Sequence, residues 1–173
     1  DALTLAFNPM GGHRHRDNLA LYYRGAGAHA VGDLGYVGDM PLNEWIRSAL
    51  SHCLVVVDDG EQEFAGRAPS LRMMATTPLA SVVEAESDAY EQCGEYRRRV
   101  ALVKLDDGGS FAVDIFRVQG GGKHAFRVYS EIAASDAAGG ALTFDGVVMA
   151  DEAPLPQVGA SLERDDIFGL RDV

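Results

Sequence analysis

The chain has 173 residues, of which 47% are hydrophobic and 24% are charged, and its formal net charge is −11 at pH 7. This length suits one domain with a sizeable core, and the composition is typical of a globular protein. The acidic excess argues against a general nucleic-acid-binding protein, because such proteins neutralise phosphates with Lys and Arg. It argues less firmly against an acidic sugar, since a cleft can be locally basic on an acidic body.

No apolar run approaches the ~18 to 20 residues that a membrane-spanning helix needs. Cys53 and Cys93 are too few for a disulfide scaffold, and their spacing does not say whether they pair. Because no CxxC-type zinc spacing is present, any metal site must use His and carboxylate ligands. The chain has neither a starting Met nor a signal peptide, so we expect it to be cut from a longer chain or processed.

Twenty glycines separate short apolar segments, a pattern that predicts many strands and turns. The predicted strands are Thr4–Phe7, Asn18–Arg24, Ala28–Leu34, Leu54–Asp58, Ala80–Glu86, Tyr96–Leu105, Phe111–Val118, His124–Ile132 and Gly146–Met149. Asp106 to Gly109 has the chemistry of a hairpin turn, since Asp and Gly tolerate positive φ. The three glycines at 120–122 predict another reversal of the chain.

One segment has helical spacing instead, with apolar residues at positions 42, 45, 46, 49 and 50 behind Asn43, a possible N-cap. It predicts either a short helix or a loop. No helices of crossover length separate the strands, so we predict an all-β fold with little helix. The expected architecture is an antiparallel two-sheet β-sandwich, jelly-roll-like, over residues 1–150. Residues 151–173 are expected to form a tail or a peripheral cover.

The densest polar feature is the run from Gly11 to Asn18, which contains His13 and His15. In an extended segment these two side chains share a face, because residues two apart point the same way. Two imidazoles can hold a divalent metal, or one can be a ligand while the other does acid–base work. An isolated HxH motif is more often a surface loop, so further ligands are needed to favour a metal site.

Asp33 and His52 are the candidate further ligands. Asp33 stands at the end of an apolar strand, where a buried charge would need a partner, and His52 stands just before the apolar run Leu54–Val57. With one His of the HxH motif they would complete a three-ligand zinc set whose fourth position is open or water-filled. Taken singly, Asp33 fits a turn and His52 fits a satisfied core histidine. Sequence spacing alone does not bring them together.

Four segments in this order resemble the central β region of the heparinase II/III family, which related alginate lyases share. They are GHRHRDNLALYY, GDLGYVGD, WIRSALSHCLVVVDDGEQ and VDIFRVQGGGKHAFRVYSE, and they span about residues 8–132. The resemblance implies a zinc ion bound by His15, Asp33 and His52, and a catalytic His13 that faces the substrate cleft. His124 matches a recurrent family position without an assigned role, and we expect a buried structural histidine there. Cys53 stands where the family usually has Asn, and we expect it to pack inward rather than to bind metal.

The family cleaves uronate-containing polysaccharides by β-elimination, so the resemblance implies a bacterial lyase acting on acidic sugars. In the family a Tyr and another His come from an N-terminal α/α toroid, which this chain lacks, and we therefore expect the chain alone to be inactive. The resemblance also implies a periplasmic or secreted location. A structural or site-organising zinc is favoured over a zinc-hydroxide hydrolase.

Two alternatives use similar residues. A cupin-like metal-dependent enzyme would also have HxH, but its motif adds a Glu in the window where Asp17, Asn18 and Leu19 stand. A noncatalytic carbohydrate-binding module would need an exposed aromatic platform, for which the single Trp45 gives little support.

Overall fold

The computed structural model describes residues 1–8, 15–25, 28–33, 35, 42–63 and 69–128. The strands are β1 Ala2–Leu5, β2 Leu21–Gly25, β3 Ala28–Val31, β4 Val55–Val57, β5 Ser70–Thr76, β6 Ala80–Glu86, β7 Cys93–Lys104, β8 Ser110–Gly120 and β9 His124–Phe126. The helical segments are α1 Leu42–Ile46 and the 3-10 turn η1 Ala49–Ser51. None of the helices in this described part is long and apolar enough to cross a membrane.

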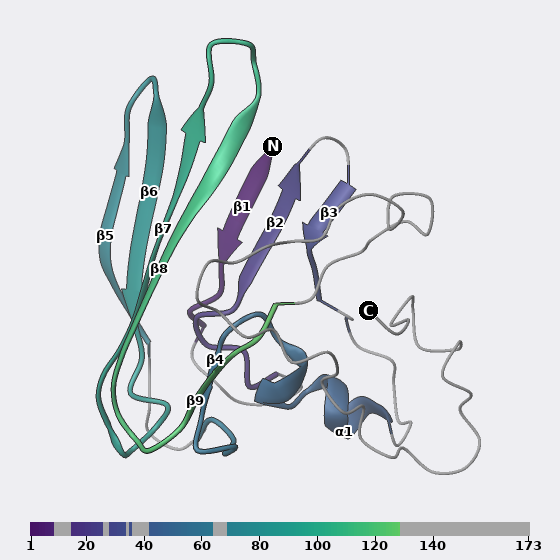
Figure 1. Ribbon diagram of the computed structural model, residues 1–173, viewed down its shortest axis with the longest axis vertical. Helices are drawn as coiled ribbons and strands as arrows, with labels where there is room; N and C mark the ends of the chain where they lie inside the picture. The colour runs from purple at the N-terminus through teal and green to yellow at the C-terminus, as the bar shows by residue number, and fades with distance from the viewer. Residues whose placement is uncertain (9–14, 26–27, 34, 36–41, 64–68, 129–173) are drawn as a thin grey trace.

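The strands form three antiparallel sheets, in the orders β1-β2-β3, β4-β9 and β5-β6-β7-β8. The four-stranded sheet is tall and curved and stands beside the sheet of β1 to β3, with α1, β4 and β9 at one end (Figure 1). The predicted all-β, antiparallel fold with little helix is confirmed. The closure of these sheets into a jelly-roll-like sandwich stays a prediction.

The main core joins residues of all three sheets. Along β7 the buried residues Tyr96, Arg98 and Val100 alternate with more exposed neighbours, so one face of the four-stranded sheet turns inward. This face packs against Leu5 of β1, Leu21 next to it in β2, and valines of β4. The two glycine-containing turns also follow expectation: Gly108 has φ 87° in the β7–β8 hairpin, and Gly120 and Gly121, at the end of β8, have φ 107° and 75°.

Several predicted elements differ from the structure. The strand β5 was missed, because its sequence SLRMMAT has no apolar alternation and its side chains are nearly all exposed. It pairs with β6, whose bounds match the prediction. Asn43 is not the N-cap, since α1 begins one residue before it. β9 ends at Phe126 rather than continuing toward Ile132. The predicted strand Gly146–Met149 and the boundary at residue 150 lie outside the described residues.

Candidate metal centre

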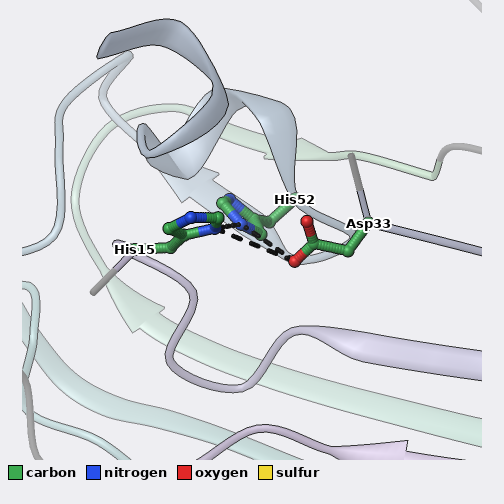
Figure 2. Close-up of side chains that lie close together, drawn as sticks. All are labelled: His15, Asp33 and His52. Carbon is green, nitrogen blue, oxygen red and sulfur yellow. Dashed lines mark hydrogen bonds and ion pairs between the residues drawn. The ribbon is translucent and has the colours of Figure 1, made fainter. Parts of the chain in front are cut away.

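Three segments that connect secondary-structure elements bring His15, Asp33 and His52 together. His15 precedes β2, Asp33 follows β3, and His52 directly follows η1. One ligand atom of each residue lies within 4.8 Å of the others, and the three side chains point toward one another (Figure 2). His15 Nδ1 is 3.0 Å from His52 Nε2, and Asp33 Oδ2 is 3.4 Å from His52 Nε2 and 3.9 Å from His15 Nδ1.

The segment around His15 is held by residues on both sides of β4. Arg16 N donates to the carbonyl oxygen of Arg47 at 2.8 Å, which ties the segment to the end of α1. The buried Gln62 forms a two-point clamp on Asn18, accepting from its N–H and donating to its carbonyl oxygen, both at 2.9 Å. These bonds fix the backbone next to His15 without using its imidazole.

His52 is 1% exposed, and contacts at Nδ1, the nitrogen turned away from Asp33 and His15, hold its ring in place. Nδ1 lies 2.7 Å from the carbonyl oxygen of Ser48 and 3.0 Å from the hydroxyl of Ser51. A carbonyl only accepts, so Nδ1 carries the proton and the lone pair of the neutral ring is on Nε2. Nε2 is the atom that faces Asp33 and His15. Hydrogen bonding of the far nitrogen to a carbonyl is how metal-binding histidines are generally oriented.

Asp33 is held at both oxygens. Oδ1 accepts the backbone N–H of Gly35 at 2.6 Å, and Oδ2 accepts the hydroxyl of Tyr22 at 3.0 Å. Burial acts to raise the pKa of Asp33, but the hydrogen bond and charge of His52, with the donors Gly35 and Tyr22, outweigh it and lower the pKa to about 2. The carboxylate is therefore ionised at neutral pH.

The pKa of His15 is lowered, first by burial and then by the neighbouring His52, so its imidazole is neutral at pH 7. The pKa of Tyr22 is raised well above its ordinary value by burial and by the carboxylates of Asp17 and Asp33, so its hydroxyl keeps its proton. At neutral pH the cluster thus contains a neutral His15 imidazole and an ionised Asp33 carboxylate. Only deprotonated ligands of this kind bind a metal.

The donor set and its spacing fit zinc. Zn–N and Zn–O bonds of about 2.0 to 2.2 Å in tetrahedral geometry place ligand atoms roughly 3.3 to 3.6 Å apart. The observed separations of 3.0, 3.4 and 3.9 Å bracket that range, so little movement of the side chains would be needed. Two imidazoles with one carboxylate are typical zinc ligands, whereas Ca²⁺ and Mg²⁺ prefer oxygen donors.

The structure brings together the three residues that were predicted as metal ligands. His13, the predicted catalytic residue, lies outside the described residues. Cys53 is 1% exposed, and its Sγ lies 3.9 Å from the carbonyl oxygen of Gly32, which confirms that it packs inward. His124 is exposed, so the expectation of a buried histidine was wrong: it lies in the short strand β9, where its Nε2 is 2.7 Å from the carbonyl oxygen of Gly120.

Sequence reasoning missed two residues that orient the ligands, Ser48 and Tyr22. Ser48 acts through its backbone carbonyl oxygen. Because every residue has this group, the sequence gives no sign of the role. The ring of Tyr22 packs against the small buried cluster that includes Ala20 and Val56, which is the default role of a tyrosine in a strand. The hydroxyl of Tyr22 could have predicted a polar partner, because a half-buried Tyr usually forms a hydrogen bond.

Searches against family models, curated proteins and solved structures returned no match. The heparinase II/III resemblance therefore depends on the four quoted motifs alone.

Proposed function

We propose that the chain binds one zinc ion through His15, Asp33 and His52. One observation carries the proposal: three potential donor atoms converge within 4.8 Å, and separate hydrogen bonds hold two of these side chains in place. In the metal-free protein, Nε2 of His52 faces the carboxylate oxygen of Asp33 at 3.4 Å and Nδ1 of His15 at 3.0 Å. Zinc binding would displace any proton from this nitrogen, because a metal ligand must be deprotonated.

The zinc has a site-organising role in this proposal. Its ligands come from three segments that flank β2, β3 and β4, so one ion would join parts of two sheets and the helical turn. Such binding adds directly to the free energy of folding. His13 stands two positions before the proposed ligand His15 in the sequence.

We further propose that the chain is the β domain of a polysaccharide lyase that cleaves uronate-containing polysaccharide by β-elimination in the periplasm or outside the cell. The order of the four motifs supports this affiliation, and the clustering of the three ligands is consistent with it. Elimination needs a base for the proton next to the carboxylate, and donors that stabilise the developing charge. His13 would supply one of these roles, with a toroid domain supplying the others.

Metal analysis of protein purified without chelator tests the zinc proposal. We expect about one equivalent of zinc in the wild-type chain, because the three ligands form one site. His15→Ala should lose the metal and the thermal stabilisation that it provides, while His124→Ala removes an exposed histidine and should change neither. Full zinc occupancy and an unchanged melting temperature in His15→Ala would refute the assignment.

The lyase proposal is tested in the longer parent chain with alginate and heparan sulfate, by following ultraviolet absorbance of the unsaturated uronate product. His13→Ala should abolish turnover and leave zinc content intact. If the 173-residue chain alone cleaves these polymers as fast as its parent, the two-domain argument fails, since misplacement of catalytic groups by about 1 Å costs on the order of a hundredfold in rate.

A further inference from the structure

Tyr22 connects the candidate metal centre to a second carboxylate, Asp17. Its phenol oxygen lies 3.0 Å from Oδ2 of Asp33 and 3.2 Å from Oδ2 of Asp17. Oδ2 is also the oxygen of Asp33 that faces the imidazoles of His15 and His52. The hydroxyl therefore contacts the carboxylate oxygen that points to the metal position, and not the oxygen turned away from it.

The ring of Tyr22 is fixed by the fold. The residue is the second of β2, where its backbone pairs with Thr4 of β1. Its ring packs against the buried cluster of Ala6, Ala20, Ala49, Leu54 and Val56. Packing of this kind restricts the side chain to one rotamer, so the hydroxyl is held at a defined point beside Asp33.

A phenol has one proton, so Tyr22 can donate fully to only one of its two carboxylate neighbours at a time. Donation to Asp33 fixes Oδ2, while the N–H of Gly35 fixes Oδ1 at 2.6 Å. The plane of the Asp33 carboxylate is then set by one donor on each oxygen. Oδ2 of Asp17, 3.2 Å from the same hydroxyl oxygen, is the second acceptor and helps to hold the hydroxyl in place.

We propose that Tyr22 is a positioning residue of the metal centre, and that the chain Asp17–Tyr22–Asp33 holds the metal-facing oxygen of Asp33 in its binding orientation. The inference rests on the zinc site proposed above and extends it to residues that do not touch the ion. Outer partners of metal ligands typically change metal affinity by ~10- to 100-fold when they are removed. Tyr22→Phe should weaken zinc binding by a factor in this range, because the carboxylate loses one of its two fixed donors.

The neighbouring Tyr23 provides a matched control on the same strand. It is also half-buried, and its hydroxyl lies 3.5 Å from Ser110 Oγ, away from the metal centre. The dissociation constant for Zn²⁺ is measured by competition with a chromophoric chelator for the wild type, Tyr22→Phe, Tyr23→Phe and Asp33→Ala. The visible spectrum of the Co²⁺-loaded protein reports ligand geometry, and thermal unfolding in excess EDTA reports the metal-free fold.

We expect Tyr22→Phe to raise the dissociation constant at least ~10-fold and to alter the Co²⁺ spectrum. Tyr23→Phe should leave both within about twofold of the wild type, and the two variants should unfold at similar temperatures in EDTA. Asp17→Asn keeps a hydrogen-bonding partner for the phenol and should weaken binding less than Tyr22→Phe does. An unchanged affinity and spectrum in Tyr22→Phe would overturn the inference, as would a larger loss in Asp17→Asn.

The two proposals fail in different ways. If the wild type binds no zinc, or if Asp33→Ala binds it as tightly, the metal centre itself is wrong and the role of Tyr22 falls with it. If the wild type binds zinc and Asp33→Ala does not, but Tyr22→Phe matches the wild type, the metal centre stands and only the positioning role is refuted.

Discussion

Arg98 of β7 donates a hydrogen bond from Nη1 to the carbonyl oxygen of Cys53 at 2.5 Å, directly after His52 of the candidate metal centre. The same nitrogen donates to the carbonyl oxygen of Leu19 at 2.7 Å, and Asp114 accepts from Nε and Nη2 at 2.8 and 2.6 Å. The guanidinium is 1% exposed and lies 4.9 Å from the ring centre of Phe116. One buried side chain thus links the four-stranded sheet to two segments that carry the metal centre.

Arg98→Ala should lower the free energy of unfolding by about 3 to 5 kcal/mol, the usual cost of breaking a buried ion pair from one side. The carbonyl oxygens of Leu19 and Cys53 would each also lose a hydrogen bond from Arg98, and that of Cys53 would keep the one from the N–H of Leu21. Urea unfolding in excess EDTA measures the change in the metal-free protein. Arg117→Ala removes an exposed arginine of β8 and should change stability by no more than about 0.5 kcal/mol. Equal stability of the two variants would contradict this role of Arg98.

The clamp that Gln62 forms on Asn18 predicts a second structural effect. Gln62→Leu has similar volume but leaves the N–H and carbonyl of Asn18 without their buried partner, which should cost about 1 to 3 kcal/mol. Zinc affinity should fall as well, since Asn18 is three residues from His15. The exposed Gln119→Leu is the control, and both variants are compared by urea unfolding and zinc titration. A stability equal to that of the control would rule out the clamp.

Acidification should destabilise the metal-free chain through His15. Burial and His52 hold its folded pKa below the ordinary value of 6.5, so the unfolded chain binds more protons between these two values. The contribution of His15 to the free energy of unfolding is therefore complete above pH 6.5. It decreases as the pH falls from 6.5 toward the folded pKa. Urea unfolding in EDTA over this pH range should show that the free energy of unfolding depends less steeply on pH in His15→Gln than in the wild type. Identical slopes would show that His15 does not contribute.

The turn after β8 should not tolerate a side chain at Gly121. Its φ is 75°, and a Cβ there would lie 2.4 Å from Cγ1 of the buried Val57. Gly121→Ala should lose about 1 to 2 kcal/mol from the left-handed backbone, with overpacking in addition. Gly94→Ala is the matched control, because its Cβ would meet no atom within 4 Å. Chemical denaturation of both variants measures the difference, and equal midpoints would contradict the steric argument.

The sequence predicted the features that depend on local chemistry. The hairpin at Asp106 to Gly109 and the strand Ala80–Glu86 follow from turn residues and apolar runs, and both were found. The strand β5 could not be predicted from its sequence pattern, because it is stabilised by pairing with β6 and not by burial of its own side chains. The three ligands were named from motifs, but their convergence depends on contacts between distant segments. The contacts of Tyr22 with Asp17 and Asp33 could not be read from its neighbours in the chain.

His15 and His52 are 37 positions apart, and this separation has a kinetic consequence for a protein that binds zinc there. A chain that has not yet assembled β2, β3 and β4 offers the ion no complete site, so zinc should have little influence on the rate of folding. The bound ion must instead be released, or its ligands parted, before the sheets separate, which slows unfolding. The metal would then determine how long the native state lasts rather than how quickly it is reached.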